Sequence, residues 1–164
     1  MAASVLCAIL LLLSPASRDG GALSAQRDTS SECLDGNWDS LDVSCVQAFF
    51  AEFSDPRYQQ NIEWSEGANE LLFRLMDRKP RLFFSALFGL SARQIAAVKK
   101  EIDNPINDGI PIRSIVAHVK QAKMPSALKK RSLALLKDTI AKERESIESW
   151  ERANGKKWAY PPWP

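Results

Sequence analysis

Helical periodicity is the sequence feature that most constrains the fold of this chain. Beyond Trp38, apolar residues recur at intervals of three and four, the spacing that places them on one face of an α-helix. The pattern covers six stretches, 39–53, 65–79, 81–88, 91–102, 112–119 and 125–153. None of the sequence after Trp38 shows the alternating, turn-bounded pattern of β-strands. We therefore expect an all-α fold with about five to seven helices.

Residues that begin or end helices mark the borders of these stretches. The expected caps and breaks, in chain order, are Asp39 or Ser40, Ser65, Pro80, Gly89, the capping box of Ser91 and Gln94, and Asn154-Gly155. Pro80 suits the first position of a helix, whereas Gly89 is expected to take a left-handed conformation. The stretch 81–88 is apolar on nearly every side, so we expect it at the centre of the fold.

Two arrangements of these helices are compatible with the pattern. The helix over 65–79, the Pro-initiated helix and the capped helix that follows resemble the antiparallel pairs of α-solenoids such as HEAT repeats. The chain has no self-similarity at a fixed period, however, which fits an irregular bundle equally well. We expect an irregular or HEAT-like bundle.

The first 25 residues are interpreted as a cleaved secretory signal peptide. Val5–Leu13 is an unbroken apolar run, and small residues follow it. As a helix this run would span about 14 Å, well short of the roughly 30 Å hydrocarbon core, which argues against a transmembrane anchor. The alternative is an apolar first helix of the mature fold. A signal peptide predicts a periplasmic, extracellular or secretory location.

Cysteine spacing predicts a disulfide in the mature chain. Removal of the signal would remove Cys7 and leave Cys33 and Cys45 in an oxidising compartment. Their bridge would tie a polar N-terminal arm, 26–38, to a helical domain, 39–155, and would contribute about 3 kcal/mol. A zinc site or a catalytic thiol would depend on the single histidine, His118, which we interpret as a surface residue. No metal and no cofactor are expected.

Charge is distributed unevenly along the chain. Asp28–Asp77 contains eleven acids and two bases, and Arg113–Lys142 contains eight bases and one acid, although the formal net charge is only +2. The two halves can attract each other within the fold, the basic half can meet an anionic surface, or one face can dock a charged protein.

The basic residues Lys129, Lys130 and Arg131 are candidate ligands for anionic lipid or polysaccharide. They stand at the start of a helix, where positive charge opposes the helix dipole. A solvated helix face is the competing interpretation. Nucleic acid is not expected as a partner, because the basic segment lacks interleaved aromatic residues.

The C-terminal tail, 156–164, is rich in aromatic residues and proline. Trp158, Tyr160 and Trp163 fall within nine residues and would be costly to leave in water. They are expected to pack back onto the bundle or, as candidate partner-binding residues, to fill a groove on another protein in an extended polyproline conformation.

Motifs for catalysis are missing from the sequence. There is no Gly-rich phosphate loop, no Gly-x-Ser-x-Gly and no His-Glu-x-x-His, and we assign no catalytic residue. Asp103, Asn107 and Asp108 have oxygen atoms that could bind a cation. A calcium loop would need further acidic ligands and a closing Glu, so we interpret these residues as part of an interhelical turn. We expect a non-enzymatic protein-interaction or structural module. The alternative is a small carboxylate-dependent hydrolase using Glu63, Glu66, Glu70 or Asp77.

Overall fold

The structure of the chain is a computed structural model that describes residues 34, 38–60, 62–106 and 109–159. Within these ranges it contains seven α-helices, two short 3₁₀ turns and no strand, which confirms the all-α prediction. The elements are η1 (Trp38–Ser40), α2 (Val43–Glu52), η2 (Tyr58–Gln60), α3 (Ile62–Arg78), α4 (Pro80–Leu87), α5 (Ala92–Asp103), α6 (Ile112–Gln121), α7 (Ser126–Leu135) and α8 (Lys137–Asn154). The expected signal peptide lies outside the described residues.

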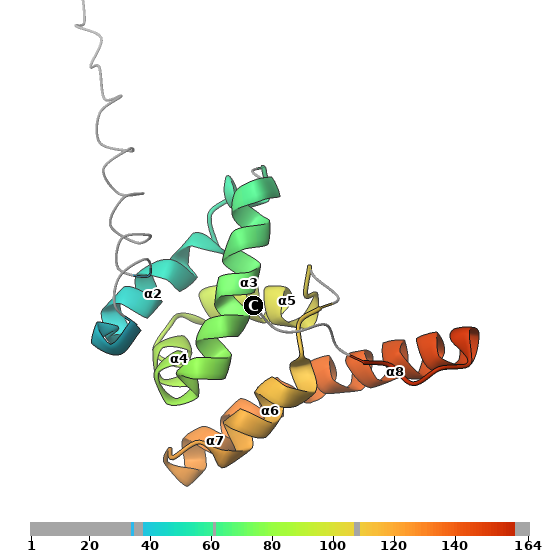
Figure 1. Cartoon of the computed structure of the whole chain (residues 1–164). Helices are drawn as coiled ribbons and strands as arrows, with labels where there is room; N and C mark the ends of the chain where they lie inside the picture. The colour runs from blue at the N-terminus through green and yellow to red at the C-terminus, as the bar shows by residue number, and fades with distance from the viewer. Residues whose placement is uncertain (1–33, 35–37, 61, 107–108, 160–164) are drawn as a thin grey trace, which may run out of the picture.

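Helix α3 lies at the centre of the bundle (Figure 1). Helices α2 and α4 pack against each other, α6 packs along α3, and α7 packs against α6. Phe50, Phe83 and Phe84 have no exposed surface. The ring of Phe83 meets those of Phe50 and Phe84 edge to face, with centroids 5.0 Å apart in each pair. The predicted burial of α4 is confirmed for one side of the helix, since Phe83, Phe84, Ala86 and Leu87 are buried, whereas Arg81 on the other side is exposed.

The first long helix begins later than predicted. The carboxylate of Asp42 accepts the N–H of Cys45 at 2.8 Å and caps α2, so the prediction of Asp39 or Ser40 as the cap is wrong. The chain forms the 3₁₀ turn η1 there instead. The carboxylate of Asp39 binds Lys79 at 2.8 Å, and this contact ties η1 to the start of α4.

Helix α3 begins at Ile62 rather than at Ser65, about one turn earlier than predicted. The buried Tyr58 accounts for the additional turn, because its ring packs edge to face against Trp64 with centroids 4.6 Å apart. Its hydroxyl lies 3.2 Å from the carbonyl oxygen of Ser65. The predicted start of α4 at Pro80 is confirmed.

Two glycines expected to end helices play different parts. Gly155, with φ of 63°, ends α8 in the left-handed conformation as predicted. The same prediction for Gly89 is wrong, because Phe88 caps α4 with right-handed geometry and Gly155 is the only glycine of positive φ among the described residues. A Cβ at Gly89 would lie 2.6 Å from Nε2 of Gln47, which donates to the Ala86 carbonyl at 3.1 Å. Gly89 therefore serves a close approach between α2 and α4.

The long helix expected over 125–153 is interrupted at Leu136, which separates α7 from α8. Ser132 is fully buried, and its hydroxyl donates to the carbonyl of Leu128 at 2.8 Å. A serine bonded four residues back in this way bends a helix. The N–H of Leu136 keeps the α-helical bond to the carbonyl of Ser132 at 3.1 Å and also contacts the carbonyl of Ala134, two residues back.

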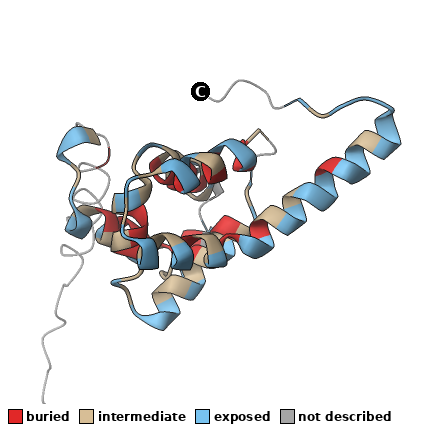
Figure 2. Ribbon diagram, turned by 90° about the horizontal axis from the view of Figure 1, so that it is seen from below, coloured by how far each residue is buried: buried red, intermediate tan, exposed pale blue. Residues whose placement is uncertain are grey.

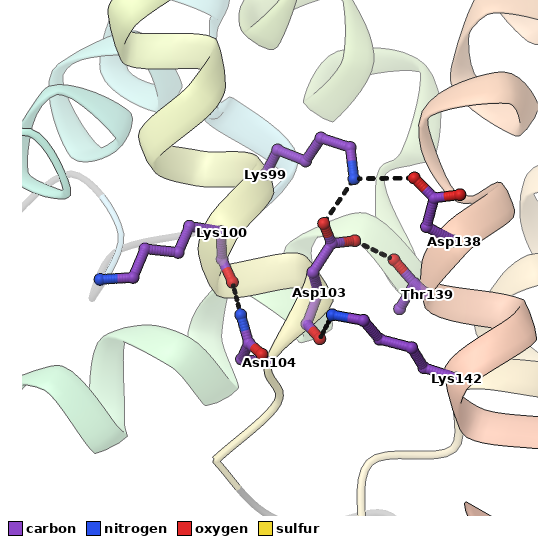
Figure 3. A network of polar contacts seen from close by, with 7 residues as sticks. All are labelled: Lys99, Lys100, Asp103, Asn104, Asp138, Thr139 and Lys142. Carbon is purple, nitrogen blue, oxygen red and sulfur yellow. Dashed lines mark hydrogen bonds and ion pairs between the residues drawn. The ribbon is translucent and has the colours of Figure 1, made fainter. Parts of the chain in front are cut away.

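A polar network joins α5 to the first turns of α8 (Figure 3). The carboxylate of Asp103 pairs with Lys99 and accepts the Thr139 hydroxyl at 2.7 Å. Lys99 also lies 3.5 Å from Asp138, and Lys142 donates to the backbone carbonyl of Asp103 at 3.4 Å. Burial lowers the pKa of Lys99, but hydrogen bonds and charge from Asp103 and Asp138 together raise it more. We call these five residues the α5–α8 clamp.

Beyond the clamp, α8 projects away from the bundle (Figures 1 and 2). We call residues 143–154 the α8 arm. Nine of its twelve residues are exposed, and Ile147 is the one buried residue among them. None of the helices in the described ranges is long and apolar enough to cross a membrane.

Candidate functional site

The three consecutive basic residues of α7 do not form one surface. Lys129 donates from Nζ to the carbonyl of Lys120 at 2.8 Å and so covers the end of α6. The guanidinium of Arg131 lies over the ring of Phe88, 3.9 Å from its centroid. Lys130 is exposed. Because consecutive helical residues point about 100° apart, the three side chains leave α7 in different directions.

Of the aromatic tail, the structure describes Trp158, while Tyr160 and Trp163 lie outside the described residues. The half-buried ring of Trp158 packs edge to face against Trp150 of the α8 arm, with centroids 4.9 Å apart. Its backbone N–H donates to Glu151 at 3.0 Å. The tail therefore turns back onto α8 at this point.

Of the two cysteines of the expected disulfide, the structure describes only one. Cys45 is half-buried and packs against the core, whereas Cys33 lies outside the described residues. The bridge between them stays a prediction.

The carboxylates considered for hydrolysis occupy different settings. Glu66 is exposed, Glu70 is half-buried, and the side chain of Glu63 is outside the description. Asp77 lies 2.6 Å from Nδ1 of His118. No group of three or more His, Cys, Asp or Glu side chains that could hold a metal ion occurs in the described part of the chain.

Of the three residues considered for a cation loop, the structure describes only Asp103. Asp103 belongs to the α5–α8 clamp. Asn107 and Asp108 lie outside the described residues. Nearby, the fully buried Asn69 donates to the carbonyl of Glu101 at 3.3 Å and accepts the N–H of Ile106 at 3.2 Å, which holds the start of this turn against α3.

A groove of about 710 Å³ lies where the α3–α4 junction meets the end of α6. We call it the α3–α6 groove. It is lined by Val43, Asp77, Arg78, Lys79, Pro80, Arg81, Leu82, Ser85, His118, Gln121, Ala122 and Lys123. The Asp77–His118 pair closes one part of the lining by joining α3 to α6. The volume is within the range of roughly 300 to 1,000 Å³ typical of small-molecule sites.

Positive charge dominates the α3–α6 groove. Four of its lining residues are Arg or Lys, and Asp77 is the one acid among them. Lys79 is paired with Asp39, and the hydrogen bond to Lys79 lowers the pKa of that carboxyl. Arg81 and Lys123 form no ion pair with another described residue, and both are exposed. The groove can therefore attract an anion.

A second cavity, of about 350 Å³, lies between the turn before α6 and the α8 arm. Its apolar lining includes Ile110, Ile112, Ile147, Trp150 and Trp158. Residues of the tail and of the body of the bundle therefore line the same cavity.

Sequence reasoning missed the α3–α6 groove. Arg78, Lys79 and Arg81 flank the break at Pro80, which could have drawn attention to this junction, but Lys123 is more than forty residues away in the chain. His118 was interpreted as a surface residue, and its pairing with Asp77 had no signal in the sequence. Comparison with models of protein families, with curated proteins and with solved structures finds no match.

Proposed function

We propose that this chain is an exported, non-enzymatic protein that acts by binding another protein through the α8 arm and its tail. The observation that carries the proposal is the projection of the arm beyond the clamp (Figure 2), with nine of twelve residues exposed. A helix that is polar nearly all round gains little from the core of its own domain. Short helices without tertiary packing are marginal in water, so the arm benefits from a second surface.

Trp150 is the proposed anchor. It is one of three large apolar residues that the described surface exposes, with 37% of its area accessible. Trp158 packs against it from the tail, so two indole rings stand together near the end of the arm. Tryptophan is enriched among the few residues that dominate the binding energy of protein interfaces.

Site-specific photo-cross-linking in the native compartment tests this proposal. A photoreactive residue at Ser149, exposed on the arm, is expected to yield a discrete protein adduct, and one at the exposed Ala127 of α7 is not. Trp150→Ala is expected to abolish the adduct. Ile106→Ala, which truncates another exposed apolar residue, provides the matched control and should leave it intact. Equal adducts at both positions, or an adduct insensitive to Trp150→Ala, would contradict the proposal.

Export and the disulfide belong to the same proposal. The mature chain is expected to begin between Ser17 and Gln26 and to contain the Cys33–Cys45 bridge. The intact mass of exported protein, measured with and without reduction and alkylation, tests both. Two free thiols in exported material would contradict the bridge. The HEAT-like arrangement of the helices stays a prediction beside these.

A further inference from the structure

We propose that the α3–α6 groove binds the headgroup and adjoining acyl chain of an anionic phospholipid. This site is separate from the α8 arm and goes beyond the protein-binding function proposed above. It also differs from the basic run at 129–131 that the sequence suggested, since two of those three side chains make contacts within the bundle.

The cationic side of the groove fits a phosphate group. Arg81 and Lys123 come from different parts of the fold, α4 and the segment after α6, and line the same groove. Neither forms an ion pair with a described residue, so both can bind an anion without breaking such a pair. Arg supplies a planar set of donors that matches phosphate oxygens, and Lys adds a compact charge.

The other cations of the groove are already engaged but still contribute to its potential. Lys79 pairs with Asp39, and the guanidinium of Arg78 lies 5.6 Å from the ring centroid of Trp38. These contacts fix the two side chains beside the α3–α4 junction. The lone acid of the lining, Asp77, contacts Nδ1 of His118 at 2.6 Å, so its carboxylate is engaged with α6.

The apolar side of the groove argues for a lipid rather than a free phosphate. Val43, Pro80, Leu82 and Ala122 line the groove together with the cations. Val43 is 41% exposed, although it is a large apolar residue at the first position of α2. A ligand with an acid group and a hydrocarbon segment would satisfy both parts of this surface, because it would pair the charge and cover the apolar area.

Calorimetric titration of the mature protein with short-chain lipids below their micelle concentration tests the proposal. Three probes separate the contributions: dihexanoyl phosphatidic acid, dihexanoyl phosphatidylcholine and inorganic phosphate. We expect saturable binding of the phosphatidic acid, at least tenfold weaker binding of the other two, and loss of affinity as salt is raised. Phosphatidylcholine supplies the acyl chains without a net negative charge, and inorganic phosphate supplies the negative charge without an acyl chain.

Variants connect the binding to the groove. Arg81→Gln combined with Lys123→Gln is expected to weaken binding of phosphatidic acid at least tenfold. Arg93→Gln combined with Lys100→Gln makes the same change of charge at exposed positions on α5 and should alter it less than twofold.

Asp77→Asn removes the one acid of the lining and is expected to tighten binding, a result that loss of folding could not produce. Absence of saturable binding, equal affinity for inorganic phosphate, or equal losses in the groove and control variants would overturn the proposal. The photo-adduct of the α8 arm should be the same in all of these variants, so the two proposals can fail separately.

Discussion

Replacement of the buried Asn69 by leucine should destabilise the fold far more than its small change in size suggests. Asn69 has no exposed surface, and its amide donates to the carbonyl and to the carboxylate of Glu101 at 3.3 and 3.2 Å. Its oxygen accepts the N–H of Ile106 at 3.2 Å. Asn69→Leu keeps the volume and removes all three bonds.

The expected cost follows from the three hydrogen bonds that are removed. Each contributes about 0.5 to 1.5 kcal/mol net, and a bond to a charged group contributes somewhat more. The acceptors of Glu101 keep other donors, because its carbonyl still accepts the N–H of Asn104 and its carboxylate still accepts the hydroxyl of Tyr58. Ile106 is 47% exposed, so water can replace part of its lost bond. We therefore expect a loss of about 2 to 4 kcal/mol in the free energy of unfolding. With a urea dependence of about 2 kcal/mol per molar, the midpoint should fall by roughly 1 to 2 M.

Equilibrium urea unfolding, followed by far-UV circular dichroism, measures this change. Asn104→Leu is the matched control, because the exposed Asn104 donates to the carbonyl of Lys100 at 2.7 Å within its own helix end. Its loss should cost less than about 1 kcal/mol. A midpoint for Asn69→Leu equal to that of the control would refute the reasoning that buried polar contacts hold α3 to α5.

Three further outcomes follow from other contacts. Trp158→Ala removes the ring that packs on Trp150, so amide exchange in 148–154 should become up to about tenfold faster while the global melting midpoint stays unchanged; unchanged exchange would mean that the tail does not stabilise α8. Gly89→Ala should cost only about 0.5 to 1.5 kcal/mol, the value of the Gln47–Ala86 hydrogen bond that it displaces, because the flexible end of Gln47 can move aside. Urea melts should show a smaller added cost when Gln47→Ala is already present. Burial, with the charge and hydrogen bond of Glu101, raises the pKa of Tyr58 above its ordinary 10.0. The neutral phenol therefore contributes fully to the free energy of unfolding below pH 10, and this contribution is lost as the pH rises further. Stability measured from pH 9 to about 11 should therefore fall less steeply in Tyr58→Phe than in the parent, and parallel curves would contradict this assignment.

The sequence allowed the helices to be predicted better than their ends and bends. Pro80 and Gly155 act through their own backbone restrictions, and these local signals were interpreted correctly. The interruption at Leu136 lies four residues after the buried Ser132, whose hydroxyl bonds back to Leu128, a local contact that periodicity does not encode. Gly89 was misjudged because its role is a contact with a residue more than forty positions earlier.

The candidate groove was harder to predict, for a physical reason. Three adjacent basic residues form a cluster in the sequence, but in a helix their side chains point in different directions. The guanidinium of Arg131 also packs over the ring of Phe88. The cations that do share a surface, such as Arg81 of α4 and Lys123 of the segment after α6, are distant in the sequence and line one groove only through tertiary packing. Likewise, the pairing of Asp77 with His118 follows from the contact between α3 and α6.

Because the arm extends beyond the α5–α8 clamp, a small rotation of α8 at the clamp produces a large displacement at the end of the arm. From Glu143 to Asn154 the helix extends about 17 Å past the clamp, at about 1.5 Å per residue. A rotation of about 10° at the clamp would therefore displace the tip by about 3 Å, enough to change which side chains it can reach. Because the clamp is built around the charged pairs of Asp103 with Lys99 and of Lys99 with Asp138, ionic strength acts on its stiffness. A few charges that lie far from its end thus contribute to the orientation of the whole helix.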